Sequence, residues 1–291
     1  ALQAARQAAE HVGLPCVLKP LALSASRGVM RADDLESFVR AYERLGALLD
    51  DPKVAMVDAE AAKSVLIESF VPGSEVAVEG LMTQGALRVL AVFDKPDPLD
   101  GPFFAETLYV TPSRHAPADV EAATDLVARA ARALEFTHGA VHAEVRLSPA
   151  GPIVVEVAAR SIGGLCARTL RFGMRMTLEE LLVRHALGYE IDNVRLRDEA
   201  AGVMMLPVLE AGVLADVSGV EAAKRVPGIE DVVISVEVGG ELVPLPEGTT
   251  YLGFVFARGF NRGEMRRVRE LTFEHQVFFV ERWNEYFGHQ R

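Results

Sequence analysis

Two glutamates that face each other across a predicted hairpin are the residues best suited to chemistry in this sequence. Residues 141–158 contain two segments rich in Val and Ile, and the Ser-Pro-Ala-Gly sequence between them predicts an antiparallel hairpin. Pairing of Ser148 with Pro152 places Glu144 opposite Glu156. Two carboxylates in this arrangement repel each other unless a cation lies between them. Because Mg²⁺ accepts one or two carboxylates and completes its shell with water and phosphate oxygens, the pair predicts a phosphate-metal site.

Side chains next to this pair extend the same face of the hairpin. His142 shares the face of Glu144 because strand side chains alternate, and Arg160 follows Glu144's partner strand. Arg160 and the backbone of Gly163 and Gly164 are suited to hold the oxygens of a transferring phosphoryl group. An ordinary solvated surface with cross-strand ion pairs explains the same residues without a metal. The hairpin alone therefore supports two interpretations.

A second candidate for phosphate binding lies near the start of the sequence. Residues 15–20 predict a short buried strand that includes Lys19, and a loop of small residues follows at positions 24–28. Backbone N–H groups of such a loop can approach a polyphosphate closely, and Lys19 would add a point charge. A surface hairpin with a snorkelling lysine is the alternative. The loop residues that we single out are Ser24, Ser26, Arg27 and Gly28.

Two acidic residues flank a predicted turn after the strand at residues 64–68. A strand that ends in a short hinge can offer its backbone to an adenine edge, and an acidic residue seven positions later can hold ribose hydroxyls. Here these residues are Glu68 and Glu75. Strand alternation places Glu79 on the face of Glu75. The alternative for each is a carboxylate on the rim of a half-exposed sheet.

Composition limits the class of protein. Half of the 291 residues are apolar, which is enough for two packed units, and the net charge of −11 comes with scattered basic residues. We therefore expect no nucleic-acid partner. No apolar run reaches the roughly 18 residues of a membrane span, and the first residues lack a signal-peptide core, so we expect a cytoplasmic protein without membrane contact. Cys16 and Cys166 predict no disulfide framework; both are expected to be packed, with a reactive thiol at Cys166 as the alternative.

Taken together, these motifs resemble the ATP-grasp superfamily in order and spacing. The motifs are Pro15-x-x-x-Lys19-Pro20, the loop at 24–28, the Glu68 to Glu75 segment, and Glu144 with Glu156-x-x-x-Arg160. Within that superfamily the chain is most similar to carboxylate–amine ligases of the L-amino acid ligase type. Its last part, with Ala211-Gly-Val-Leu and Pro227-Gly-Ile, resembles the unit that follows the ATP-grasp domain in those ligases. The resemblance covers about residues 2–260.

The resemblance implies an α+β fold of the ATP-grasp type, in which two α+β subdomains sandwich the nucleotide and a small, mostly β domain follows. The character of the sequence changes near residue 200, where a charged connection gives way to short strands and turns. We therefore expect a small subdomain at 1–72, a large subdomain with the metal-binding hairpin at 73–199, and a C-terminal ligase-associated domain with an aromatic tail at 200–291.

The resemblance also implies a role for each candidate residue. Lys19 would bind the phosphates of ATP while the 24–28 loop closes over them. Glu144 and Glu156 would hold Mg²⁺, with Mn²⁺ as an alternative metal. The remaining implied roles are the adenine frame (Glu68 and the Phe70-Val71 backbone), the ribose (Glu75), phosphoryl stabilisation (Arg160, Gly163, Gly164) and the amino-acid pocket (Lys95, Glu106, His142).

The implied reaction joins a small-molecule carboxylate to an amine through an acylphosphate intermediate. Phosphorylation gives a carboxylate a good leaving group, so catalysis is mainly positioning and charge neutralisation. Other ATP-grasp chemistry, such as carboxylation or nucleotide-precursor synthesis, and a noncatalytic ATP-binding module are the alternatives. The family often has asparagine where this sequence has Ala158. Such ligases also carry an N-terminal domain with a further nucleotide-contacting lysine, so association with such a domain, or a homodimer, is expected.

Overall fold

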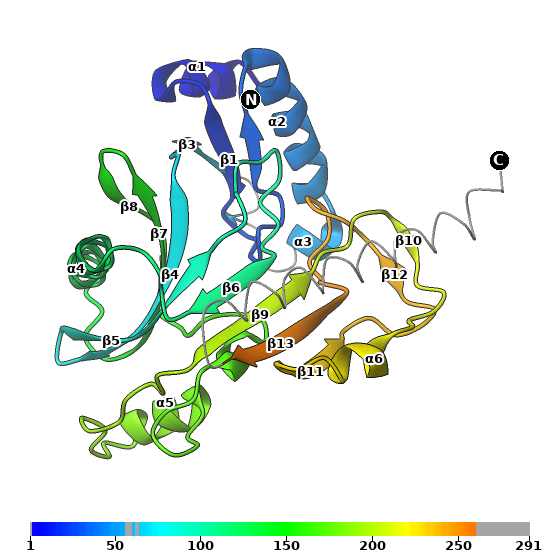
Figure 1. Ribbon diagram of the computed structural model, residues 1–291. Helices are drawn as coiled ribbons and strands as arrows, with labels where there is room; N and C mark the ends of the chain where they lie inside the picture. The colour runs from blue at the N-terminus through cyan, green and yellow to red at the C-terminus, as the bar shows by residue number, and fades with distance from the viewer. Residues whose placement is uncertain (1, 56–59, 62–63, 260–291) are drawn as a thin grey trace.

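One long antiparallel sheet and one short sheet organise the chain (Figure 1). The computed structural model describes residues 2–55, 60–61 and 64–259. The predicted aromatic tail lies outside these residues. The helices are α1 (Leu2–Val12), α2 (Leu35–Leu49), α3 (Pro52–Ala55), α4 (Pro117–Ala133), the 3₁₀ helix η2 (Cys166–Thr169), α5 (Leu178–Ala186) and α6 (Val220–Lys224). The strands are β1 (Cys16–Pro20), β2 (Met30–Ala32), β3 (Val65–Ser69), β4 (Ser74–Thr83), β5 (Ala86–Lys95), β6 (Leu108–Thr111), β7 (Gly139–Ser148), β8 (Gly151–Ala158), β9 (Ala200–Leu206), β10 (Gly212–Val213), β11 (Ile229–Ile234), β12 (Glu241–Leu242) and β13 (Gly253–Gly259).

The short sheet has the order β2-β1-β3 and carries α1 and α2 against it. Helix α2 is amphipathic, and it buries Phe38 and Leu45 in the core of this unit. Asp34 caps the helix, because its carboxylate accepts a hydrogen bond from the backbone N–H of Ser37 at 2.7 Å. The helices thus cover part of the sheet, while Val17 and Lys19 of β1 line a cavity.

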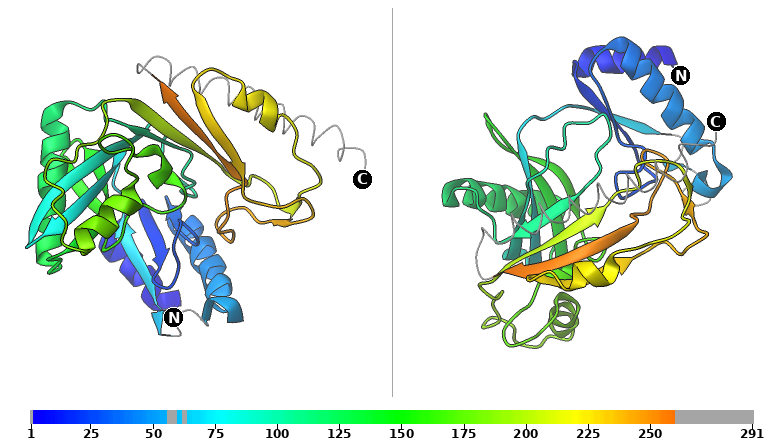
Figure 2. Two further views of the ribbon diagram at one scale, coloured as in Figure 1. Left: turned by 90° about the horizontal axis from the view of Figure 1, so that it is seen from below. Right: turned by 45° about the vertical axis from the view of Figure 1, so that its right-hand side comes forward.

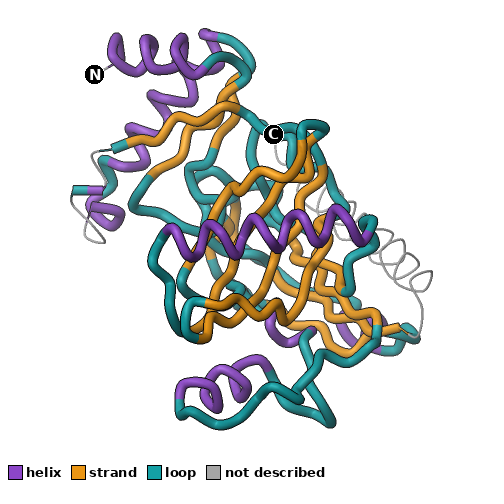
Figure 3. The backbone as a smooth tube through the Cα atoms, turned by 90° about the vertical axis from the view of Figure 1, so that its left-hand side faces the viewer, coloured by secondary structure: helices purple, strands orange, loops and turns teal. Residues whose placement is uncertain are grey.

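The long sheet has eight strands in the order β11-β13-β9-β6-β5-β4-β7-β8. Figure 3 shows α4 lying across its strands. Small residues of α4, Ala123 and Ala131, are fully buried there and allow close packing on the sheet. A separate core cluster joins the central strands to η2 and α5. None of the helices in the described residues has the length and apolar character needed to cross a lipid bilayer.

The hairpin of β7 and β8 confirms that Glu144 lies opposite Glu156, but the predicted turn register was wrong. Ser148 pairs with Gly151 instead of Pro152, which tightens the turn to two residues. A bulge between Glu144 and Val145 then shifts the register, so that the two glutamates still meet. Without the bulge, the shorter turn would have shifted the pairing by one residue, and Glu144 would not lie opposite Glu156.

The long sheet continues across residue 200. Strand β9 pairs with β6 on one side and with β13 on the other. The C-terminal segment therefore adds three strands, β9, β13 and β11, to the sheet that carries the hairpin (Figure 1). The domain boundaries expected from the sequence at residues 72 and 200 remain predictions. The ATP-grasp fold class is addressed with the comparisons below.

Replacement of Gly73 by alanine is expected to destabilise the protein by roughly 2–4 kcal/mol, in the range of backbone-strain and overpacking substitutions. Gly73 has φ +119°, and a Cβ placed on it would lie 2.3 Å from the carbonyl oxygen of Leu147. Urea unfolding measures the change. The control is Gly85→Ala, because Gly85 also has a positive φ but no atom within 4 Å of its Cβ position. Equal losses in the two variants would contradict a steric role for Gly73.

Candidate functional site

A cavity of about 800 Å³ lies between the short sheet and the long sheet. Its wall combines β1, the 24–28 loop, the β3–β4 connection, the β7–β8 hairpin and residues of the C-terminal segment. The structure therefore brings together residues from distant parts of the sequence. The candidates that line the cavity are Lys19, Ser24, Ser26, Arg27, Glu68, Phe70, Val71, Glu75, Glu106, His142, Glu144, Glu156, Arg160, Gly163 and Gly164.

The other two candidates, Gly28 and Lys95, are not part of the cavity wall. Gly28 has φ +73° and donates its backbone N–H to the carbonyl of Pro246 at 2.8 Å, so its role is in shaping the loop. Ala25 and Ser26 also have positive φ values, which are uncommon outside glycine. The loop is therefore held in a conformation that its own sequence does not favour.

Lys19 forms an ion pair with Glu68 across the short sheet, with 2.5 Å between Nζ and Oε2. Both side chains reach the cavity and remain partly exposed. An anion that enters the cavity can therefore approach Lys19. The guanidinium of Arg31 lies 4.0 Å from the centroid of the neighbouring Phe70 ring, which lines the cavity.

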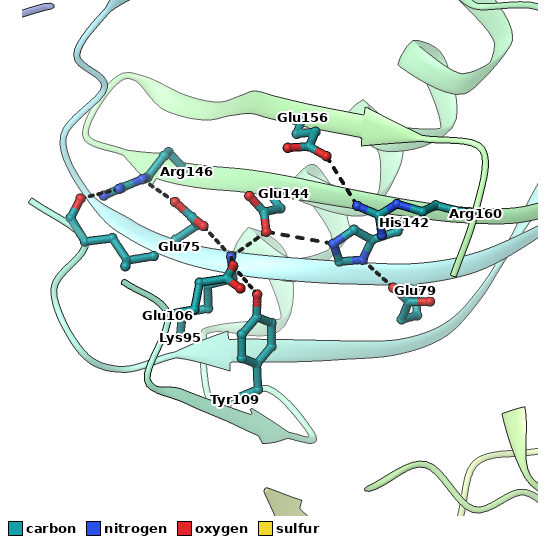
Figure 4. Close-up of polar contacts among 11 residues, drawn as sticks. Glu75, Glu79, Lys95, Glu106, Tyr109, His142, Glu144, Arg146, Glu156 and Arg160 are labelled. Carbon is teal, nitrogen blue, oxygen red and sulfur yellow. Dashed lines mark hydrogen bonds and ion pairs between the residues drawn. The ribbon is translucent and has the colours of Figure 1, made fainter. Parts of the chain in front are cut away.

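A buried cluster of charges lies under the hairpin (Figure 4). Lys95 donates to Glu75 at 2.6 Å, to Glu106 at 2.8 Å and to Glu144 at 2.6 Å. Burial opposes the positive charge of Lys95, but the surrounding carboxylates outweigh it and hold its pKa well above the usual value. Arg146 binds the second oxygen of Glu75 at 2.7 Å. Each carboxylate oxygen of Glu75 therefore already binds a cationic side chain, one Lys95 and the other Arg146.

His142 connects this cluster to the glycine-containing loop after β8. Its Nδ1 forms a hydrogen bond with Glu79, and its Nε2 lies 3.8 Å from Glu144. Burial lowers the pKa of His142, but the hydrogen bonds and charges of Glu144 and Glu79 raise it to about 9. Glu79 also accepts the backbone N–H of Ile162 at 3.1 Å. The sequence pattern placed Glu79 on this face but gave it no role, and its connection to Ile162 follows only from the fold.

Glu144 and Glu156, although opposite each other, point toward different cations (Figure 4). Glu144 contacts Lys95, while the half-exposed Glu156 lies 3.6 Å from Arg160. No three His, Cys, Asp or Glu side chains gather into a metal site within the described part of the chain. The pair still fits Mg²⁺ because that ion needs only one or two carboxylates when phosphate oxygens complete its shell. The donor set suits a metal that arrives with a polyphosphate.

Arg160, Gly163 and Gly164, which follow β8, also line the cavity. The Arg160 guanidinium is half exposed and donates to the carbonyl of Ser161 at 2.9 Å, so it remains accessible to an anion. Gly164 has φ +60° and lies beside Phe254 of the C-terminal segment. Sequence patterns gave no indication of this contact. The same is true of Ser235, Thr249, Thr250 and Tyr251, which also line the cavity.

The 800 Å³ cavity is lined by the cations Lys19 and Arg160 and by the opposed carboxylates Glu144 and Glu156, a combination suited to a polyphosphate with a divalent cation. Comparison with known families gives the class a name. The ATP-grasp domain family matches residues 12–169, and L-amino acid ligase C-terminal domain 2 matches residues 204–274. The chain therefore belongs to the ATP-grasp family. The resemblance and the ATP-grasp fold class inferred from the motifs are confirmed.

Proteins with similar sequence include a synthase and two ligases. Dapdiamide A synthase from Enterobacter agglomerans is 30% identical over 157 residues, which are 54% of this chain and 35% of that protein. Alanine–anticapsin ligase from Bacillus subtilis is 29% identical over 177 residues, with the same two coverages of 54% and 35%. The crystal structure of an L-amino acid ligase from Bacillus licheniformis superposes with a TM-score of 0.75 at 28% identity, and it covers 90% of this chain and 64% of that one.

The chain spans only part of these proteins. It covers half or less of the curated relatives named here and less than two thirds of the solved ligase. Solved structures of a biotin carboxylase and of a carboxyaminoimidazole ribonucleotide synthase also match, with TM-scores of 0.60 and 0.68, but their identities of 14% and 17% show the fold alone.

Proposed function

We propose that this protein is an ATP-dependent carboxylate–amine ligase that forms an amide between small amino-acid substrates through an acylphosphate. The observation that carries the proposal is the single cavity in which Lys19, the Glu144–Glu156 pair and Arg160 meet. The similarity to dapdiamide A synthase, alanine–anticapsin ligase and the solved L-amino acid ligase favours this reaction over carboxylation or a noncatalytic role.

In this proposal the residues of the short sheet and its loop hold the nucleotide. Lys19 neutralises phosphate charge in place of its present pairing with Glu68, and the backbone of the 24–28 loop approaches the phosphates. Phe70 and Val71 border the adenine, with Glu68 and Glu75 near the nucleoside. Because both Glu75 oxygens already bind Lys95 and Arg146, its contact with a ribose would have to share those oxygens.

Glu144 and Glu156 would hold Mg²⁺, which supplies charge neutralisation for the phosphate oxygens when it is bound. A substrate carboxylate oxygen attacks the γ-phosphorus while the bond to the bridging oxygen breaks and ADP leaves. Arg160 and the Gly163-Gly164 backbone stabilise the negative charge of the transferring group. The amine nitrogen then attacks the acyl carbon, phosphate leaves, and the ammonium proton passes to solvent or a nearby base.

Substrates, partners and location extend the proposal. Glu106 and His142 line the cavity and are suited to the amino-acid substrates, whereas Lys95 would act from behind the wall by holding three carboxylates. Mn²⁺ would substitute for Mg²⁺ at a site with oxygen donors. We also propose association with an N-terminal domain, or a homodimer, and a cytoplasmic location, to which two buried free thiols are suited.

The test is phosphate release from the complete protein with Mg·ATP and pairs of amino acids, followed by product mass analysis. We expect ADP and phosphate only when both a carboxylate and an amine are present, with a product mass equal to the two substrates minus water. Dependence on bicarbonate would favour carboxylation. Saturable ATP binding without turnover would contradict the ligase reaction.

A further inference from the structure

The loop between β12 and β13 reaches from the C-terminal segment to the small subdomain (Figures 1 and 2). Residues 244–250 of this loop contact both the 24–28 loop and helix α2. These loop residues lie outside the ATP-grasp motifs of the sequence. Thr249 and Thr250 of the same loop line the main cavity, so the contact lies at the edge of the candidate nucleotide site.

Two backbone carbonyls of this loop bind the candidate phosphate loop. The carbonyl of Pro246 accepts the N–H of Gly28 at 2.8 Å. The carbonyl of Glu247 accepts the Arg27 Nε–H at 2.7 Å. These bonds hold the 24–28 loop where Ala25, Ser26 and Gly28 have positive φ values. Because such a conformation is unfavourable for non-glycine residues, it needs support from outside the loop.

The side chain of Glu247 anchors the contact to the body of the small subdomain. Its carboxylate binds Arg44 of α2 through two parallel bonds, Nε to Oε1 at 2.6 Å and Nη2 to Oε2 at 2.8 Å. The bidentate geometry fixes direction as well as distance. Arg44 also lies over the ring of Phe103, 5.2 Å from its centroid, which limits the freedom of the guanidinium.

We propose that Glu247 is a positioning residue for triphosphate binding: by anchoring the 244–250 loop to Arg44, it holds the 24–28 loop in the conformation that receives the phosphates. The inference rests on the proposed function, because it assumes that the 24–28 loop binds ATP phosphates. It adds that the C-terminal segment forms part of the nucleotide site. Glu247 itself need not touch the nucleotide.

The experiment is calorimetric titration of the full chain with a non-hydrolysable ATP analogue plus Mg²⁺, and separately with AMP. In Glu247→Gln the affinity for the triphosphate is expected to fall about fivefold, the size of effect expected for a well-oriented, partly exposed ion pair. The affinity for AMP should stay unchanged, because AMP lacks the β- and γ-phosphates. Combining Arg44→Glu with Glu247→Arg should restore triphosphate binding.

The matched control is Arg40→Gln, which breaks the Arg40–Glu36 ion pair on the exposed side of the same helix and leaves the cavity wall intact. Equal losses for AMP and the triphosphate in Glu247→Gln would indicate a general structural role and overturn the inference. Unchanged triphosphate binding in that variant would also overturn it, while leaving the ligase proposal standing. A wild-type chain that binds no triphosphate would overturn both proposals.

Discussion

Replacement of Glu144 by glutamine is expected to reduce amide-forming turnover about 100- to 1000-fold, the range for loss of one preorganised charged group at a reacting centre. Glu144 is the better buried of the two opposed glutamates, and it contacts both Lys95 and His142. Glutamine keeps the shape of the side chain but removes the charge that would bind a divalent cation in the proposed reaction. Steady-state turnover over a range of Mg²⁺ concentrations measures the effect.

The Mg²⁺ dependence distinguishes metal binding from a structural role. If Glu144 and Glu156 share the ion, Glu156→Gln should also reduce turnover, and both variants should require more Mg²⁺ for half-maximal rate. Glu156 is half exposed and lies 3.6 Å from the half-exposed Arg160, so its replacement should not destabilise the fold. Wild-type turnover and Mg²⁺ dependence in Glu156→Gln would remove the hairpin metal site.

Replacement of Lys95 by methionine is expected to lower the free energy of unfolding by about 3–5 kcal/mol, the cost of leaving buried charges without their partner. Lys95 is 5% exposed and is the common donor to Glu75, Glu106 and Glu144. Methionine has a side chain of similar volume to lysine, but it carries no charge, so the three carboxylates would repel one another. Urea unfolding at pH 7 measures the difference.

The pH dependence of this loss provides an internal control. The pKa of Lys95 is raised above its unfolded value, so its stabilising contribution is fully present below the unfolded pKa near 10.5 and is lost as the pH rises through the folded pKa. The wild type therefore keeps this contribution throughout pH 5–9. In Lys95→Met the carboxylates can accept protons as the pH falls, so the deficit should be smaller at pH 5 than at pH 8. A deficit that does not change with pH would contradict the electrostatic explanation.

Sequence patterns located much of the cavity wall because the relevant residues lie in local motifs. The small-residue loop after Lys19 and the Val- and Ile-rich hairpin each carry a short-range signal, and strand alternation then places Glu144 and Arg146 on one face. The hairpin turn was less predictable. The bulge beside Glu144 has no glycine or proline to mark it, and the shorter turn compensates for it in register.

The pairing of charges could not be predicted from local signals. Glu75 lies beside Lys95 in β5 and beside Arg146 in β7 because of the two registers of β4, and a shift of one residue would turn these side chains to the other face. The contact between Arg27 and Glu247 spans 220 positions in the sequence. This contact depends on how the C-terminal strands extend the long sheet. The spacing of motifs in the sequence does not predict that arrangement.

The shared sheet has a consequence for how proteins of this kind can be recombined. The ATP-grasp match ends at residue 169 and the C-terminal domain match begins at residue 204, yet β6 of the first region is hydrogen-bonded to β9, which runs into the second. A chain cut between β6 and β9 would expose unpaired backbone N–H and C=O groups along the edge of β6. Such an exposed edge strand is a site of aggregation. Exchange of C-terminal units between ligases would therefore have to preserve the β6–β9 seam, and the two halves are expected to be inherited as a matched set.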